Sequence, residues 1–139
     1  MAIKYLLDTN ILSEPVRKLP NPNVVERLQQ AEDTVAIAST TWHELLFGTL
    51  RLAESRRRTA LEQYLFHTIR AQIPILPYDA QAATWFAQER VRLSQKGLPP
   101  AYPDGQIAAV AVANELILVT RNVADFANFS DLKVENWFE

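Results

Sequence analysis

The sequence predicts an α/β protein, a sandwich in which helices cover a buried, parallel sheet. Two observations support this prediction. Short apolar or β-branched segments alternate with segments of helical periodicity along the whole chain. Parallel strands need crossover helices, so this alternation favours mixed layers over separate α and β parts. The 139 residues suit one domain, because domains most often contain about 100–150 residues. No linker divides them, and we expect a single domain over residues 1–139.

The expected strands are short. Residues 3–7 form an apolar run that ends at Asp8, which is typical of a buried strand. Pro74 limits the segment at residues 73–76 to an edge strand, since proline cannot donate to a sheet ladder. The strand expected at residues 132–137 has the weakest sequence pattern. The further expected strands are 34–38, 73–76, 116–120 and 132–137.

The expected helices are placed by apolar periodicity and by end signals. Asn21 followed by Pro22 indicates a helix N-cap and a first helical residue. Proline-rich loops are expected over residues 15–23 and 97–103. The expected helices are 10–14 (one turn), 22–31, 40–53, 61–69, 79–94 and 104–114, and Arg56–Arg58 interrupt the apolar pattern before the fourth.

Composition excludes several classes of site. Cysteine is absent, which removes disulfide scaffolds, thiolate zinc sites and cysteine nucleophiles. Two histidines cannot form a three-histidine zinc site, and the three glycines lack the spacing of a phosphate-binding loop. The longest apolar run, residues 107–113, is far shorter than the ~18 residues of a membrane span. With no export signal at the N-terminus, we expect a cytoplasmic protein.

Four acids lie where the expected fold places a ligand crevice. In parallel sheets that crevice lies beyond the carboxyl ends of the strands. Asp8 ends the first strand, Glu44 follows the second, Asp104 opens the helix before the fourth, and Asp125 lies just beyond the fourth. The four residues are separated by 36, 60 and 21 positions. We therefore expect these acids to converge from distant parts of the chain on one edge of the sheet.

Such a gathering of carboxylates has a chemical consequence. Like charges raise the pKa of at least one member unless a cation neutralises them. Magnesium or manganese suits oxygen ligands, and such an ion activates water and stabilises charge on a phosphoryl oxygen. Four acids without histidine or cysteine therefore point to metal-dependent phosphodiester chemistry rather than zinc-dependent peptide hydrolysis.

Each acid also has a structural explanation that stays open at this point. Asp104 suits a helix cap after a proline. Glu44 lies three residues after Thr41, which is the spacing of a capping box. Asp125 suits a plain turn.

Asp8 is the hardest acid to explain structurally, because an acid that ends a buried strand is unfavourable unless it is paired. The adjoining Thr9 and Asn10 supply hydrogen-bonding groups that either support the carboxylate or cap the next helix.

Four motifs containing these acids resemble those of PIN-domain ribonucleases. They are Leu-Leu-Asp-Thr-Asn-Ile at 6–11, Trp-His-Glu-Leu at 42–45, Pro-Asp-Gly-Gln-Ile-Ala-Ala at 103–109 and Leu-Val-Thr-Arg-Asn-Val-Ala-Asp-Phe at 118–126. Their order, spacing and the chain length are most similar to the VapC type, the toxin of a bacterial toxin–antitoxin pair. One departure is Pro103, which stands where the family usually has a small residue before the third acid.

The resemblance implies a five-stranded parallel sheet between helices and assigns roles to residues. Asp8 and Asp104 would be the principal Mg²⁺ or Mn²⁺ ligands. Glu44 and Asp125 would complete the catalytic site, directly or through water. Thr120 and Asn122 would orient the acids or the scissile phosphate.

The resemblance also implies an activity and partners. A metal-activated water would cleave single-stranded or loop RNA endonucleolytically. The protein would form a homodimer, and a cognate VapB-type antitoxin would cover the site.

The net charge of −2 is low for an RNA-binding protein, since phosphate contacts require cations. Setting aside the four acids (−4) leaves the remainder at +2, so binding would depend on local basic patches. For Arg56–Arg58 a solvated helix start is the simpler interpretation. Other candidates are Arg17, Lys18, Arg90, Arg92, Lys96 and Arg121.

Two other functions remain open from sequence alone. One is a phosphatase with Asp8 as nucleophile, although Asn10 stands where such enzymes have a second acid. The other is a non-catalytic PIN-like module that binds RNA or protein.

Overall fold

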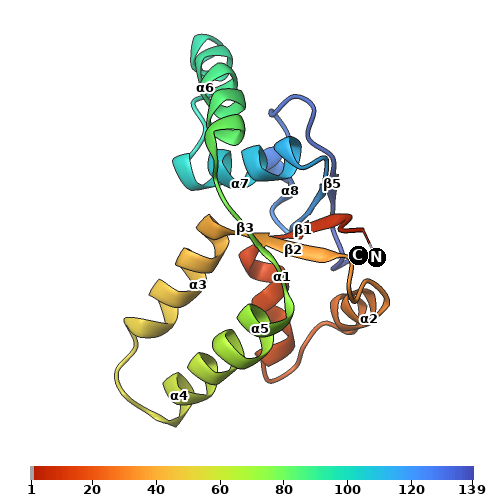
Figure 1. The fold of residues 1–139 in the computed structure, drawn as a ribbon, viewed down its shortest axis with the longest axis vertical. Helices are drawn as coiled ribbons and strands as arrows, with labels where there is room; N and C mark the ends of the chain where they lie inside the picture. The colour runs from red at the N-terminus through yellow and green to blue at the C-terminus, as the bar shows by residue number, and fades with distance from the viewer. Residues whose placement is uncertain (1) are drawn as a thin grey trace.

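The computed structural model describes residues 2–139 and contains a five-stranded sheet in the order β3-β2-β1-β4-β5 (Figure 1). Every pairing of neighbouring strands is parallel. The strands are β1 (Tyr5–Leu7), β2 (Val35–Ala38), β3 (Ile75–Leu76), β4 (Ile117–Val119) and β5 (Val134–Glu135). The expected α/β class and five parallel strands are confirmed, with β1 at the centre.

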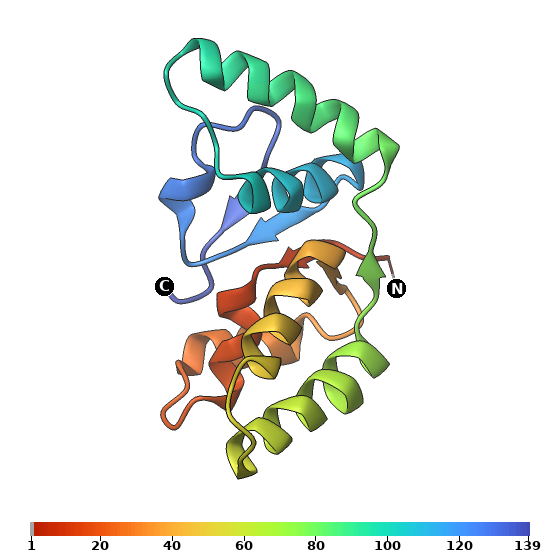
Figure 2. The same cartoon turned by 90° about the vertical axis from the view of Figure 1, so that its left-hand side faces the viewer.

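Helices cover both faces of this sheet, as the turned view in Figure 2 shows. The helices α6, α7 and α8 lie on one side, and those from α1 to α5 lie on the other (Figures 1 and 2). The helical segments are α1 (Thr9–Ser13), the 3₁₀ turn η1 (Glu14–Val16), α2 (Pro22–Gln30), α3 (Ser39–Leu50), α4 (Arg56–Gln63), the π-helical η2 (Tyr64–Ile69), α5 (Arg70–Gln72), α6 (Ala80–Gln95), α7 (Tyr102–Ala113) and α8 (Val123–Phe126).

The core forms two clusters, one on each face of the sheet. Successive strand residues point to opposite faces, so Leu6 packs in the cluster beneath α6 and α7, and Leu7 packs in the cluster beside α1 and α2. Both side chains are fully buried. Trp137, just after β5, is also buried and meets Tyr5 edge-on with ring centroids 5.1 Å apart. Trp137 therefore packs the residues after β5 into the cluster beside α1 and α2.

Two helix starts differ from the sequence expectation, and one further helix is present. Helix α7 begins at Tyr102 rather than at Asp104, because Pro103 is tolerated in a first turn, where its missing N–H is not needed. Helix α4 begins at Arg56, with Ser55 as its N-cap, so the arginine run lies inside the helix. The short helix α8 was not expected.

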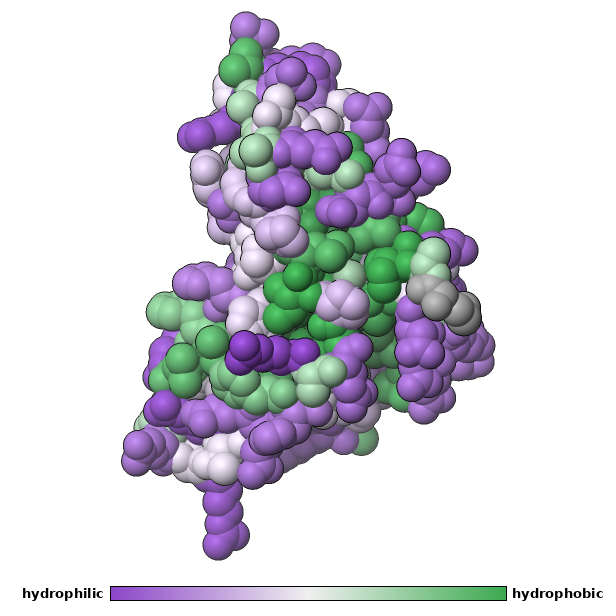
Figure 3. Space-filling view, in the orientation of Figure 1, coloured by the Kyte–Doolittle hydropathy of each residue, from purple (hydrophilic) through white to green (hydrophobic). Residues whose placement is uncertain are grey.

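Apolar and polar side chains are separated on the face of the molecule seen in Figure 3. Figure 3 shows apolar side chains gathered over the middle of one face, with polar regions above and below, and a hollow on its left-hand edge. Among the described residues, no helix is long and apolar enough to span a membrane.

Candidate active site

The carboxyl ends of the central strands lie on the side of the molecule that faces the viewer in Figure 2. Helix α3 follows β2 directly, α1 follows β1 after one residue, and α8 follows β4 after three. The first turn of α7 reaches the same side. These four elements carry the four acids predicted from the sequence, and we call Asp8, Glu44, Asp104 and Asp125 the acidic site.

Asp8 is buried, with 6% of its surface exposed, and its carboxylate is held by three hydrogen bonds. Oδ1 accepts from the backbone N–H of Thr9 at 2.8 Å. Oδ2 accepts from Thr120 Oγ1 at 2.8 Å and from Asn10 Nδ2 at 3.5 Å. Asp8 is also the N-cap of α1. Of the two roles left open for Thr9 and Asn10, the structure shows support of the Asp8 carboxylate, and Asp8 rather than either neighbour caps α1.

Thr120, fully buried at the end of β4, links the loop after β4 to α1. Besides donating to Asp8, its Oγ1 accepts from the Asn122 backbone N–H at 3.0 Å and from Asn10 Nδ2 at 3.4 Å. Asn10 Oδ1 in turn accepts from the Arg121 backbone N–H at 3.0 Å. These bonds fix the direction in which the Asp8 carboxylate points.

Glu44 lies in α3, one turn past its start, and faces Asp8. Thr9 Oγ1 donates to Glu44 Oε1 at 3.4 Å. Burial raises the pKa of Glu44, and the charge of Asp8 raises it further. The capping-box interpretation with Thr41 is wrong, because α3 already begins at Ser39 and the Thr41 hydroxyl is buried without a hydrogen-bond partner among residues 2–139.

Asp104 and Asp125 approach from the other side of the sheet. Asp104 lies in the first turn of α7, and Ala101 occupies the N-cap position, so the capping interpretation of Asp104 is wrong. Burial raises the pKa of Asp104 to about 6, with further contributions from the charges of Asp125, Asp8 and Glu44, in that order. Asp125 is exposed in the first turn of α8 rather than in a plain turn. The coupling to Asp104 brings all four carboxylates into one electrostatic group.

Gly105 sets how closely the Asp104 turn packs on α6. A Cβ at this position would overlap the ring of Phe86, which is buried on α6. Only glycine allows this approach. The Asp-Gly pair is visible in the sequence, but the need for glycine follows only from the position of Phe86 on the neighbouring helix.

The donor set fits a hard divalent cation. All four groups are carboxylates, the ligand type that magnesium and manganese prefer, and burial together with the charges of the other three acids raises the pKa of Asp104. As the side chains stand, no three histidines, aspartates or glutamates among residues 2–139 could together hold one ion. Magnesium typically takes one or two carboxylates and keeps several waters, so it does not require three.

A groove of about 1130 Å³ leads away from Glu44 between α1 and η1 on one side and α3 and α4 on the other. We call it the α1–α3 groove. Its lining combines leucines with cations, a mixture that suits an amphipathic or anionic occupant. The cations are Arg17, Lys18, Arg51 and Arg57. Arg17, Lys18 and Arg57 are among the basic residues considered from the sequence, whereas Arg51 and the groove itself were not expected.

Most of the chain, including the acidic site, matches a known protein family. A family model described as "PIN domain" matches residues 5–132. The chain belongs to the PIN domain family. The matched range includes all four acids, and the resemblance drawn from the motifs is confirmed.

Among PIN domain proteins, the chain is similar to named toxins and ribonucleases. It is 33% identical over 135 residues to the "tRNA(fMet)-specific endonuclease VapC" of Shigella flexneri, covering 97% of this chain and 98% of the relative. It is 36% identical over 125 residues to "Toxin FitB" of Neisseria gonorrhoeae, covering 87% and 89%. A solved structure of FitAcB from Neisseria gonorrhoeae matches with a TM-score of 0.90 and 33% identity, covering 97% and 99%. The chain is thus a VapC-type PIN domain.

Proposed function

We propose that this PIN domain is an endoribonuclease, the toxin component of a toxin–antitoxin pair, that hydrolyses a phosphodiester bond of single-stranded or loop RNA. The observation that carries the proposal is the acidic site, in which burial and then the charges of Asp125, Asp8 and Glu44 raise the pKa of Asp104 although the four carboxylates are distant in sequence. VapC-type relatives named as endonuclease and toxin support the same reaction class. They favour RNA cleavage over the phosphatase alternative.

We further propose that the reaction depends on Mg²⁺ or Mn²⁺. Asp8 and Asp104 would hold the ion, with Glu44 and Asp125 completing the site directly or through water. When bound, such an ion activates a water for attack and stabilises negative charge on the phosphoryl oxygens.

The chain's own residues prepare this site before any ligand binds. Thr120 and the Thr9 N–H hold both oxygens of Asp8 at 2.8 Å. The Thr9 hydroxyl connects Asp8's helix to Glu44 at 3.4 Å. Such preorganisation keeps the carboxylates apart and correctly aimed, which limits the rearrangement needed when charge develops on the phosphate.

A VapB-type antitoxin is the proposed protein partner. Solved structures similar to this chain include toxin–antitoxin complexes, among them FitAB bound to a DNA fragment, with a TM-score of 0.90 and 31% identity. Glu44 is one of the residues that line the α1–α3 groove, so a segment seated there would also lie against the Glu44 side of the acidic site. The homodimer stays a prediction, which the mass of the purified protein in solution tests.

The decisive experiment titrates Mg²⁺ or Mn²⁺ into the purified protein and follows cleavage of a structured RNA. Cleavage should require the ion, stop with a chelator and fall by orders of magnitude in Asp8→Asn, while the melting temperature stays near that of the wild type. Asp33→Asn is a matched control, because Asp33 is exposed and its positive φ suits asparagine. RNA binding without cleavage at any metal concentration would instead support the non-catalytic module.

A further inference from the structure

Arg121 stands beside the acidic site, one residue after the threonine that holds Asp8. Its backbone N–H donates to Asn10 Oδ1 at 3.0 Å, which fixes where the residue leaves β4. Its guanidinium carbon lies over the ring of Phe138, 4.6 Å from the ring centroid. This is the shortest of the cation–ring distances found among the described residues. The side chain is exposed, yet its direction is set at both ends.

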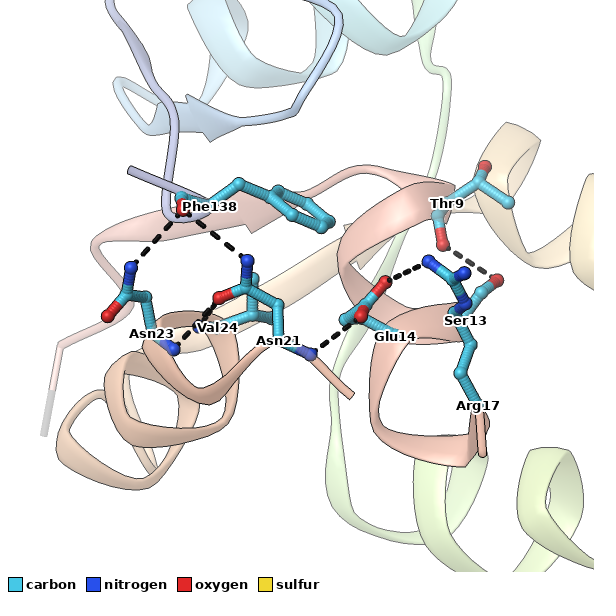
Figure 4. Close-up of polar contacts among 8 residues, drawn as sticks. All are labelled: Thr9, Ser13, Glu14, Arg17, Asn21, Asn23, Val24 and Phe138. Atoms are coloured by element: carbon cyan, nitrogen blue, oxygen red, sulfur yellow. Dashed lines mark hydrogen bonds and ion pairs between the residues drawn. The ribbon is translucent and has the colours of Figure 1, made fainter. Parts of the chain in front are cut away.

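The ring beneath Arg121 is itself held in place. The Phe138 carbonyl accepts hydrogen bonds from Asn23 Nδ2 at 3.2 Å and Asn21 Nδ2 at 3.5 Å, and Figure 4 shows the ring projecting toward α1. The preceding residue, Trp137, is 1% exposed and packed in the core. The end of the chain is therefore a fixed platform for the guanidinium.

The guanidinium of Arg121 has N–H donors available for a ligand. No ion pair links it to a residue within 2–139, whereas the guanidiniums of Arg17, Arg27, Arg58 and Arg92 are each paired. The nearby carboxylate of Glu14 is already occupied, because it accepts from Arg17 at 3.1 Å and from the Asn21 N–H at 2.7 Å (Figure 4). A guanidinium presents five donors in a planar fork, which matches two oxygens of a phosphate.

An RNA strand that approaches the acidic site needs such a cation. The four carboxylates repel phosphates, and the net charge of −2 gives no general attraction. Cations in the α1–α3 groove lie on the Glu44 side, whereas Arg121 follows β4 on the side of the C-terminus. Arg121 therefore offers a phosphate contact outside the α1–α3 groove, in the loop between β4 and α8.

We propose that Arg121 is a substrate-binding residue that holds an RNA phosphate at the edge of the acidic site, and that Phe138 is a positioning residue acting through Arg121. The inference rests on the proposed function for the identity of the ligand. It adds the residue that fixes the strand on the C-terminal side and the aromatic ring that sets its direction.

Binding is measured separately from cleavage, by fluorescence anisotropy of a labelled single-stranded RNA in chelator, in the Asp8→Asn background. Arg121→Ala should weaken binding about ten-fold or more, since charge-assisted bidentate contacts are strong. It should also reduce the slope of log K against log salt by about 0.7, the loss of one phosphate contact on a single strand. The RNA affinity of Arg121→Lys, which keeps the charge without the planar fork of donors, should lie between those of the wild type and Arg121→Ala.

Arg70→Ala is the matched control, because the Arg70 guanidinium also lies over a ring, that of Phe66 at 5.9 Å, but on α5. Its binding should stay within about two-fold of the wild type. In the active protein, Arg121→Ala should raise KM while kcat changes by no more than about three-fold. Equal losses in Arg70→Ala and Arg121→Ala would overturn the proposal, because they would reflect general charge.

Phe138→Leu tests the positioning role. It should weaken binding about two- to five-fold, the range of an exposed cation–π contact. Combined with Arg121→Ala, it should add nothing further, whereas a merely structural role would make the two losses additive. If the wild type cleaves no RNA with any metal, the proposed function fails, but the anisotropy series still decides whether Arg121 binds RNA. Unchanged affinity and salt slope in Arg121→Ala would overturn the proposal.

Discussion

Thr120 Oγ1 donates a 2.8 Å hydrogen bond to Asp8 Oδ2 across 112 positions of the sequence, and both residues are buried. The bond joins the ends of the two neighbouring strands β4 and β1. It is the contact that turns a buried aspartate, otherwise unfavourable, into an oriented carboxylate.

Replacing Thr120 by valine tests this bond, because valine keeps the shape and removes the hydroxyl. The Asn122 N–H would lose its acceptor and Asp8 a donor. We expect unfolding to become easier by about 1–3 kcal/mol and RNA cleavage to slow at least ten-fold. Urea denaturation and single-turnover cleavage measure the two effects. Thr120→Ser keeps the hydroxyl and should retain most of both. Full activity in Thr120→Val would show that Asp8 needs no such support.

The pKa of Asp104 predicts how stability depends on pH in metal-free protein. The pKa rises from 3.8 in the unfolded chain to about 6 in the fold, so the folded state binds more protons and loses stability as pH rises from about 4 to about 6. Asp104→Asn should therefore be more stable than the wild type at pH 7.5. Because the carboxyl is partly exposed, solvent screening limits the gain to about 1 kcal/mol.

Urea denaturation with and without Mg²⁺ checks this dependence on pH. At pH 4 the stabilities of the wild type and Asp104→Asn should converge. Magnesium should stabilise the wild type more than the variant at pH 7.5. A gain of the same size at both pH values would contradict the electrostatic explanation.

Gly105→Ala should destabilise the protein, since its Cβ would overlap the Phe86 ring. Overpacking in a core typically removes about 1–3 kcal/mol. The movement of α7 should also displace Asp104 and lower the cleavage rate. Gly48→Ala is a sharp contrast, because nothing lies within 4 Å of a Cβ there. In the middle of α3 that change should stabilise the fold by about 0.5–1 kcal/mol. Thermal melts should show a lower melting temperature for Gly105→Ala and a higher one for Gly48→Ala than for the wild type.

Glu89, which lies on α6 outside the acidic site, predicts a second dependence of stability on pH. Its carboxylate accepts from Arg92 at 2.8 and 2.9 Å and from the Ser130 N–H at 2.7 Å. The side-chain bond from Arg92 is the main cause that lowers the pKa of Glu89 from 4.5 to about 2. A lowered pKa adds stability above about pH 4.5 that is lost as pH falls toward 2.

Glu89→Gln should therefore lower the free energy of unfolding by about 1–2 kcal/mol at pH 7, after allowance for screening by solvent. The difference from the wild type should narrow as pH approaches 2. Glu32→Gln, at an exposed position, should change little at any pH. Denaturation curves at a series of pH values measure the narrowing, and a constant difference would assign the loss to packing instead.

Most of the sheet was predictable from sequence, because buried strands such as residues 34–38 are apolar, β-branched and bounded by turn residues. Helix α8 was missed because four residues are too few to show periodicity. The π-helical turn of η2 also leaves no sequence signal, since the same residues satisfy an ordinary helical pattern.

The convergence of the four acids was predictable because chain order alone places strand ends on one edge of a parallel sheet. The capping interpretation of Glu44 failed because α3 starts without a linker after β2, which shifts the residue beyond the first turn. The stacking of Arg121 on Phe138 was not predictable, since it depends on how residues after β5 fold back beside α1.

The central position of β1 has a consequence for synthesis of the protein. Asp8 is synthesised long before its partners, because the backbone group that pairs with its N–H belongs to Val119, and its hydroxyl partner belongs to Thr120. A nascent chain that has not yet exposed β4 lacks both. The Asp8 carboxylate therefore acquires its support only after β4 has been synthesised and has paired with β1.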